Sequence, residues 1–117
     1  MKLDAMWDHI ERLAAQHDIK VDTGRVDQPA GAFAVHWDRR ICIPPLRSAA
    51  GYATAPHEIG HVVLGWCADD DREIEQERAA WDWARRNALV WTPAMERCAT
   101  SAFARISSKA ARRASAR

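Results

Sequence analysis

Residues 56–64 of the chain read Pro56-His57-Glu58-Ile59-Gly60-His61-Val62-Val63-Leu64. They contain the pattern His-Glu-x-x-His. On a helix, His57 and His61 are one turn apart on the same face, so both can bind one metal ion from the same side. Glu58 then lies beside the ion, where it can accept a proton from a bound water. The pattern predicts a metal site if the rest of the chain supplies a third protein ligand.

The helix that carries this pattern has signals at both ends. Pro56 fits the first turn of a helix, where its missing N–H costs nothing, and Thr54 is a suitable cap for a helix that begins at Ala55. A start near Ser48 is the alternative, and it would place the proline in the helix interior and require a kink. Gly65 is a suitable terminator. Residues 57–64 are helical on either account.

The residues before this helix predict another helix and a small antiparallel sheet. Apolar residues recur at three- and four-residue steps over residues 3–17, which is typical of a helix with one buried face. Residues 19–22 alternate as a short strand. Residues 32–37 and 41–43 also alternate and are separated by a polar turn, so they predict a β-hairpin.

Two more helices are predicted after the metal-binding pattern. The first spans about residues 71–89, with Asp70 as its N-cap and Glu73 as the capping-box partner. The second spans about residues 93–106, with Thr92 as its cap.

Length and charge indicate one domain with a distinct end. A chain of 117 residues can bury one modest core. Its net charge is +1, but residues 105–117 carry five basic groups and no acid, so the remainder is mildly acidic. We expect residues 1–106 to form a single domain and residues 107–117 to form a basic, flexible tail.

Composition also indicates a cytoplasmic protein. The three cysteines are an odd number without CxxC spacing, which favours a reducing compartment over a disulfide framework. The N-terminal residues include acids where a signal peptide needs an apolar run, and no stretch approaches the ~20 apolar residues of a membrane span. We therefore expect no membrane partner.

A third metal ligand is required, because catalytic zinc sites use three protein ligands and a water. No histidine follows His61, so a carboxylate on the next helix must serve, and the candidates are Glu73, Glu75 and Glu77. Glu77 lies within the apolar stripe of that helix, where a carboxylate is costly unless it is paired or binds a metal. Glu75 points away from the stripe, and capping explains Glu73. We expect His57, His61 and Glu77 to bind Zn²⁺, with Glu73 in reserve.

Two segments resemble a known family. His57-Glu58-Ile59-Gly60-His61 and Glu77-Arg78-Ala79-Ala80-Trp81-Asp82-Trp83-Ala84 are similar to the paired motifs of the ImmA/IrrE-type metallopeptidases. Those motifs read His-Glu-Leu/Ile-Gly-His and Glu-x-x-Ala-x-x-aromatic-Ala, and the family's metal-binding glutamate falls on Glu77. Ile41-Cys42-Ile43-Pro44-Pro45 resembles the strand before the metal helix, especially in small phage or prophage members. The resemblance covers about residues 33–95. The chain departs from the family at Trp81, where members often have asparagine.

The resemblance implies a minimal zincin-like domain. Together with the predicted elements, it gives an α+β fold that is mostly helical, with a small antiparallel sheet beside the HExxH helix. It implies a gluzincin-like, zinc-dependent endopeptidase. The substrate implied is a specific protein, such as a phage or mobile-element repressor, rather than bulk peptide.

The expected mechanism assigns the base to Glu58. Bound zinc lowers the pKa of its water towards ~7, and Glu58 takes that proton and passes it to the leaving amine. Tyr52 and His36 are the candidate donors to the oxyanion. The alternatives are that Tyr52 is a packing residue and that His36 faces solvent from its strand. A peptide substrate could add as an extra strand along the edge of the hairpin.

Two other functions remain compatible with the sequence. A metal-containing protein-interaction or regulatory domain without protease activity would need the fold and the metal, but not Glu58 as a base. The basic tail could contact nucleic acid through phosphates. No recognition motif accompanies the tail, so we do not expect nucleic acid to be the main partner.

Overall fold

The computed structural model describes residues 3–65 and 72–116. Two short 3-10 turns, Pro29–Gly31 and His36–Asp38, flank the second strand. The helices and strands are, in order, α1 Leu3–Gln16, β1 Lys20–Asp22, β2 Phe33–Val35, β3 Arg40–Cys42, α2 Ala49–Tyr52, α3 Thr54–Leu64, α4 Glu73–Asn87 and α5 Pro93–Ala116. The fold is α+β and mostly helical, which confirms the predicted class.

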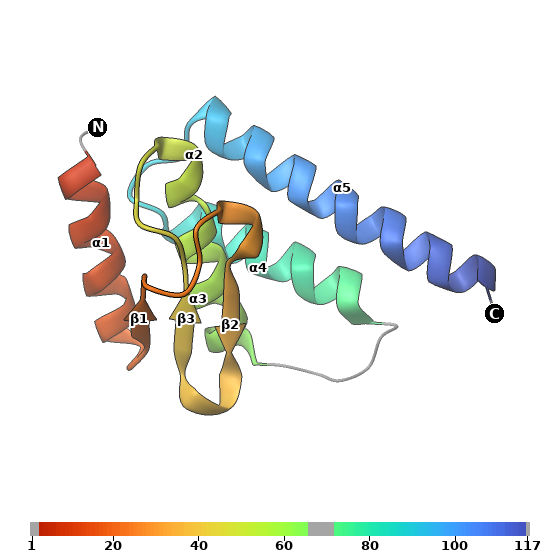
Figure 1. Cartoon of the computed structure of the whole chain (residues 1–117), viewed down its shortest axis with the longest axis horizontal. Coiled ribbons are helices and arrows are strands. Elements are labelled where there is room, and N and C mark those ends of the chain that lie inside the picture. The colour runs from red at the N-terminus through yellow and green to blue at the C-terminus, as the bar shows by residue number, and fades with distance from the viewer. Residues whose placement is uncertain (1–2, 66–71, 117) are drawn as a thin grey trace.

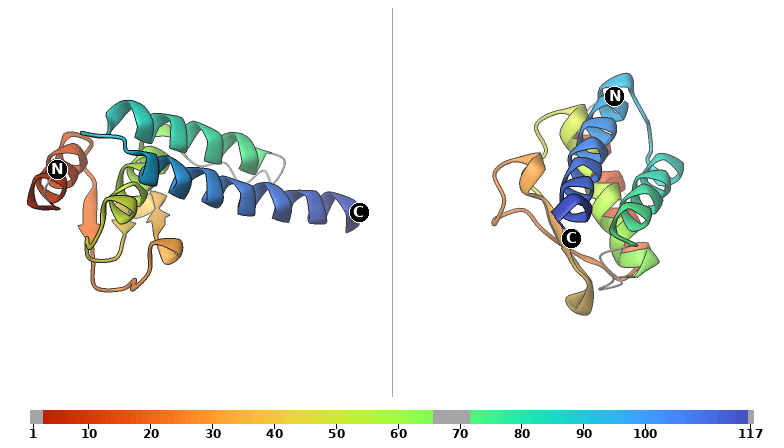
Figure 2. Two further views of the ribbon diagram at one scale, coloured as in Figure 1. Left: turned by 90° about the horizontal axis from the view of Figure 1, so that it is seen from above. Right: turned by 90° about the vertical axis from the view of Figure 1, so that its right-hand side faces the viewer.

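Helix α3 lies at the centre of the fold (Figure 1). It contacts strands β2 and β3 on one side and α4 on the other, so the sheet and α4 lie on opposite sides of it (Figure 2). Helix α1 packs against β1, α2 and α3. Helix α5 runs beside α4, and its second half extends beyond the rest of the molecule (Figures 1 and 2).

The sheet has three strands in the order β1-β3-β2. Strands β2 and β3 are antiparallel, with Ala34 opposite Ile41, so the predicted hairpin is confirmed. Strands β1 and β3 are parallel, with Val21 opposite Ile41. The prediction of a wholly antiparallel sheet is wrong, because the chain after β1 crosses to the far edge before it forms β2. It returns to the middle as β3, which therefore runs in the same direction as β1.

Strand β2 ends earlier than predicted. The alternation over residues 32–37 predicts a strand that includes Trp37, but β2 stops at Val35 and His36–Asp38 form a 3-10 turn. Arg39 completes the turn in the left-handed region, with φ of 48°. The side chain of Trp37 is 89% exposed at this turn.

Both proposed helix starts before the metal-binding pattern occur. Helix α2 follows Ser48, whose Oγ accepts a hydrogen bond from the N–H of Gly51 at 3.1 Å. Helix α3 begins separately at Thr54, which places Pro56 in its first turn. Thr54 is not the cap, because its Oγ1 donates to the carbonyl of Gly51 at 2.8 Å. Gly65 ends α3 with φ of 86°, as predicted.

The last two helices differ from their predicted bounds. Helix α4 begins at Glu73, and its predicted cap Asp70 lies outside the described residues. Thr92 caps α5 as predicted, since its Oγ1 accepts a hydrogen bond from the N–H of Met95 at 3.2 Å. The predicted end near Ile106 is wrong, because α5 continues through Ala116. No glycine or proline follows Pro93, and alanine, arginine and lysine favour helix.

The core lies between α1, the sheet, α3 and the inner faces of α4 and α5. Its largest fully buried side chains include Trp81, Tyr52, Met6, Ile10, Ile41, Ile43, Ile59 and Met95. Each element named above contributes through one apolar face, as its sequence period predicts. Within the described parts of the chain, none of the helices has the length and apolar character needed to span a membrane.

Candidate metal centre

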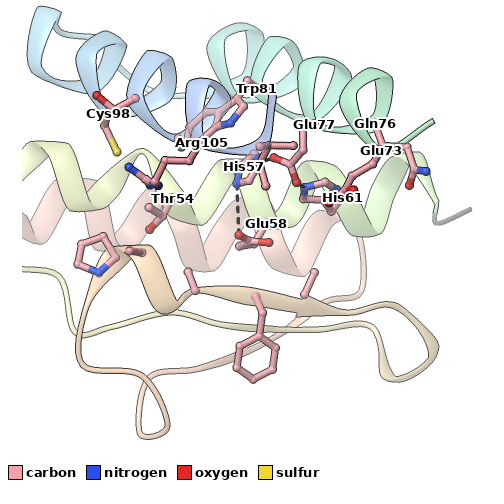
Figure 3. Close-up of a pocket in the computed structure, with 18 of the residues that line it drawn as sticks. Thr54, His57, Glu58, His61, Glu73, Gln76, Glu77, Trp81, Cys98 and Arg105 are labelled. Atoms are coloured by element: carbon pink, nitrogen blue, oxygen red, sulfur yellow. Dashed lines mark hydrogen bonds and ion pairs between the residues drawn. The ribbon is translucent and has the colours of Figure 1, made fainter. Parts of the chain in front are cut away.

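His57 and His61 project from one face of α3 towards α4 (Figure 3). They are one helical turn apart, and their ring centroids are separated by 4.7 Å. His57 is buried, whereas His61 is partly exposed. The predicted helical spacing therefore places both imidazoles side by side.

Glu77 reaches the two histidines from α4. Its Oε2 lies 2.9 Å from Nε2 of His57, and its Oε1 lies 2.8 Å from Nε2 of His61. One ligand atom from each residue lies within 4.8 Å of the others. The structure brings together the three residues that the sequence predicted as ligands. Whether they bind a metal remains a prediction.

The other two candidate glutamates do not join this group. Glu73 forms an ion pair with Arg113 of α5. Glu75 is exposed to solvent, as the sequence predicted. Among the described residues, the group of side chains that could hold a metal ion contains Glu77 but neither Glu73 nor Glu75.

Gly60 explains how Glu77 comes so close. A Cβ atom at this position would lie 3.1 Å from the carbonyl oxygen of Ala80 and 3.2 Å from Cε3 of Trp83. Both of these atoms belong to α4, so only glycine lets the two helices approach this closely. The close approach of α4 beside His61 therefore depends on Gly60.

His57 and Glu77 form an ion pair. Burial alone would lower the pKa of His57, but hydrogen bonds to Glu58 and Glu77 outweigh it and raise the pKa to about 9. Burial would raise the pKa of Glu77, but hydrogen bonds from His57 and His61 lower it to about 2. His57 is therefore cationic and Glu77 anionic at neutral pH, and a metal ion would have to displace the proton between them.

This donor set fits a divalent cation of the zinc type. Two imidazole nitrogens and one carboxylate form a known set of protein ligands for catalytic Zn²⁺. Here all three donors face one another from two helices that are packed together. The carboxylate is charged and partly buried, a placement that a bound cation would stabilise.

Glu58 lies on the other side of His57 from Glu77, towards the sheet (Figure 3). The side chain is buried, and its Oε2 lies 3.2 Å from Nδ1 of His57. Glu58 lines the same cavity as the candidate ligands and is not one of them. Glu58 therefore lies on the Nδ1 side of His57, whereas Nε2 of the same ring faces Glu77. Its role as a base beside a metal stays a prediction.

Trp81 forms part of the site, and the sequence did not predict this role. Its ring stacks on His57, with centroids 3.9 Å apart and planes 11° from parallel. Its Nε1 is buried and has no hydrogen-bond partner among the described residues. Trp81 follows Glu77 by one turn of α4, so its position on the ligand-bearing face was the signal available in the sequence.

The two candidate oxyanion donors have different positions. His36 lines the cavity, and its ring centroid is 6.3 Å from that of His61, so it does not simply face solvent from a strand. Tyr52 is fully buried elsewhere, and its hydroxyl bonds to Nδ1 of His9 at 2.8 Å and to the N–H of Leu89 at 2.9 Å. Tyr52 is therefore a packing residue, which is the alternative that the sequence left open.

A cavity of about 750 Å³ surrounds the candidate ligands. One wall is β2 and the segment before it, including Phe33 and Ala34. The opposite wall is formed by α4 and α5, with residues such as Cys98 and Ala102. The candidate ligands and Glu58 line the same cavity, so a molecule of peptide size could reach them.

Comparison with known proteins identified no relative: no family model, no curated protein and no solved structure matches the chain.

Proposed function

We propose that the chain is a zinc-dependent endopeptidase of the HExxH…E, gluzincin-like type. The observation that supports this most strongly is the convergence of His57, His61 and Glu77 from α3 and α4, with Glu58 beside them in one cavity. Three protein ligands with a neighbouring carboxylate are the constellation expected of metal-assisted hydrolysis.

Each residue has a distinct task in this proposal. His57, His61 and Glu77 hold the zinc, and the contact of Glu58 Oε2 with Nδ1 of His57 orients the ring. Zinc, when bound, supplies the Lewis acid that acidifies water and polarises the scissile carbonyl. Glu58 accepts a proton from the attacking water and delivers it to the leaving amine. His36, which lines the cavity, is the proposed donor to the negative charge that develops on the carbonyl oxygen.

Strand β2 offers a way to bind the substrate. In the three-stranded sheet, β2 is an edge strand, and Phe33, Ala34 and neighbouring residues line the cavity. An extended peptide that paired with this edge would lie beside β2 in the cavity that Glu58 also lines. Backbone pairing provides affinity with little demand on sequence, so specificity would have to come from the cavity walls.

We further propose that the chain is an ImmA/IrrE-type peptidase that acts on one specific protein, such as a phage or mobile-element repressor, in the cytoplasm. The resemblance of the two motifs and the pairing of their helices support this assignment. At Trp81, where the family often has asparagine, ring stacking would replace hydrogen bonding as the support for His57.

The decisive experiment measures bound zinc and proteolysis on the same samples. Wild type, His57→Ala, His61→Ala and Glu77→Ala are loaded with zinc, desalted and analysed for metal, with Glu75→Ala as the matched control on α4. Only the first three variants should lose zinc. If Glu77→Ala retained zinc, the assignment of Glu77 as the third ligand would be wrong.

Glu58→Gln tests catalysis separately from metal binding. This variant should keep zinc, yet lose about 10²- to 10⁴-fold in the rate of cleavage of a proteome-derived peptide library, because a general base contributes about that factor. If the variant cleaved as fast as wild type, or if wild type showed no zinc-dependent cleavage, the proposal that the chain is a zinc endopeptidase would be wrong.

A metal-containing interaction domain is the second candidate, and one contact favours it. Glu58 touches Nδ1 of His57, which is what a purely orienting carboxylate would do at a structural metal site. If this candidate is correct, the Glu58→Gln variant should keep the biological effects of the protein, whereas the Glu77→Ala variant should lose them.

A further inference from the structure

A cationic side chain in the cavity wall forms no ion pair with any of the described residues. Three of the described acidic groups line the cavity wall. Glu58 and Glu77 contact the histidines of the site, and Glu73 forms an ion pair with Arg113. Arg105 also lines the cavity. It forms no hydrogen bond or ion pair with any residue in the described ranges 3–65 and 72–116.

The position of Arg105 follows from the period of α5. Cys98, Ala102, Arg105 and Ile106 are spaced by four, three and one residues, so they share the face of α5 that lines the cavity. Two of these residues are small, which leaves room beside the arginine. Arg105 is solvent-exposed, so an incoming ligand can reach it.

Arg105 lies at a defined end of the cavity. Figure 3 shows its side chain projecting from α5 towards Thr54, near the beginning of α3, whereas Glu73 and Gln76 lie at the opposite end. His57 and Glu58 lie between the two ends. A peptide that occupied the cavity along α3 would therefore place one residue beside Arg105 when its scissile bond is near Glu58.

We propose that Arg105 determines specificity by binding a carboxylate of the substrate, so that the preferred segment carries Asp or Glu near the scissile bond. A guanidinium is always charged, and its planar set of donors matches a carboxylate. The role of Arg105 rests on the proposed function, because it assumes that the cavity is the substrate cleft. It goes further by naming the chemistry of the substrate.

The test measures binding, so that it does not depend on catalysis. The protein is zinc-loaded Glu58→Gln, and the probes are amidated ten-residue peptides of Ala, Ser and Leu with one Glu, Gln or Lys at each position in turn. One further peptide carries a free C-terminal carboxylate, which distinguishes a terminal from a side-chain carboxylate. At one position, Glu should bind about tenfold more tightly than Gln, the effect of an ionised hydrogen bond.

The same measurement on Arg105→Gln should abolish this preference, and Arg105→Glu should shift it to the Lys peptide. Arg97→Gln is the matched control, since Arg97 lies on the same helix, is exposed and does not line the cavity. It should keep the preference for Glu. Thermal unfolding checks that all variants are folded.

Equal binding of the Glu and Gln peptides, absence of binding to all of them, or survival of the preference in Arg105→Gln would overturn the role of Arg105. Failure of the proposed function looks different. In that case wild type binds acidic peptides through Arg105 but does not cleave them.

Discussion

The indole ring of Trp81 stacks on the imidazole of His57, with centroids 3.9 Å apart and an interplanar angle of 11°. One ring belongs to α4 and the other to α3, so the contact joins the helices that carry the candidate ligands. The stack fixes the plane of His57 and covers one of its faces. It therefore supports the site by packing, in a position where a polar residue would support it by hydrogen bonding.

Removal of this ring should weaken both the fold and the site. Trp81→Ala should destabilise the protein by about 3–5 kcal/mol, because it leaves a large cavity in the core. It should also lower zinc affinity at least about tenfold, because His57 loses its support. Urea unfolding of the metal-free protein and competition with a zinc chelator measure the two effects.

Trp81→Phe separates stacking from the N–H group. Phenylalanine can keep the stack, and it removes a buried donor that has no partner among the described residues. Its cost in stability should be well below that of Trp81→Ala, and its zinc affinity should be close to wild type. A loss of zinc equal to that of Trp81→Ala would show that the indole N–H, rather than the stack, supports the site.

Gly60→Ala should separate Glu77 from the histidines. The added Cβ would lie 3.1 Å from a backbone oxygen of α4, which cannot move alone, so the helices must shift apart. We expect a loss of about 1–3 kcal/mol in stability and weaker zinc binding. Gly24→Ala is the control, since its Cβ would meet only a side-chain oxygen at 3.7 Å. Full zinc affinity in Gly60→Ala would contradict the role given to this close approach.

Metal binding should stabilise the fold, because its ligands come from two separate helices. At a free zinc concentration of 100 times the dissociation constant, the gain is about 2.7 kcal/mol. Addition of a chelator should therefore lower the unfolding temperature of wild type. It should have no effect on Glu77→Ala, whereas Glu75→Ala should respond like wild type. A chelator effect that persists in Glu77→Ala would place the zinc elsewhere.

The free energy of unfolding should depend on pH through Glu96, which lies on α5 and is not part of the candidate metal site. Its carboxylate accepts hydrogen bonds from Nε of Arg85 at 2.8 Å, from Nη2 of Arg85 at 3.0 Å and from Nε1 of Trp91 at 2.9 Å. The bonds from Arg85 and Trp91 lower the pKa of Glu96 to about 2. They join the end of α4, the following loop and the beginning of α5.

The direction in which stability changes with pH follows from the lowered pKa of Glu96. Because the folded-state pKa lies below the ordinary value, the stabilisation is complete above pH 4.5 and is lost as the pH falls through about 2. Glu96→Gln should be less stable than wild type at pH 7, and the difference should shrink towards pH 2. Urea midpoints in the presence of a chelator test this. A difference that does not change with pH would contradict the proposed origin in charge.

Local signals in the sequence predicted most of the elements and the ligand cluster. Ser48, Pro56 and Gly65 act on the backbone within a few residues, so the limits of α2 and α3 could be read from them. Glu77 was predictable because a carboxylate within an apolar stripe requires a partner, and the structure places two histidines there. These inferences needed no knowledge of the tertiary fold.

The errors concern relationships that local sequence does not encode. The parallel pairing of β1 with β3 depends on the path of the chain between them, which the strand pattern does not specify. The continuation of α5 beyond Ile106 was missed because a basic segment was read as a solvated tail, although its residues favour helix. The stack of Trp81 on His57 depends on how α3 and α4 pack.

Helix α3 has the sheet on one side and α4 on the other, so the consecutive residues His57 and Glu58 have different neighbours. Substitutions on α4 would change the affinity for the metal ion, and substitutions on β2 would change how the substrate peptide binds. An engineer could therefore retune metal preference and substrate choice in two separate libraries, and combine the best members of each with little interference.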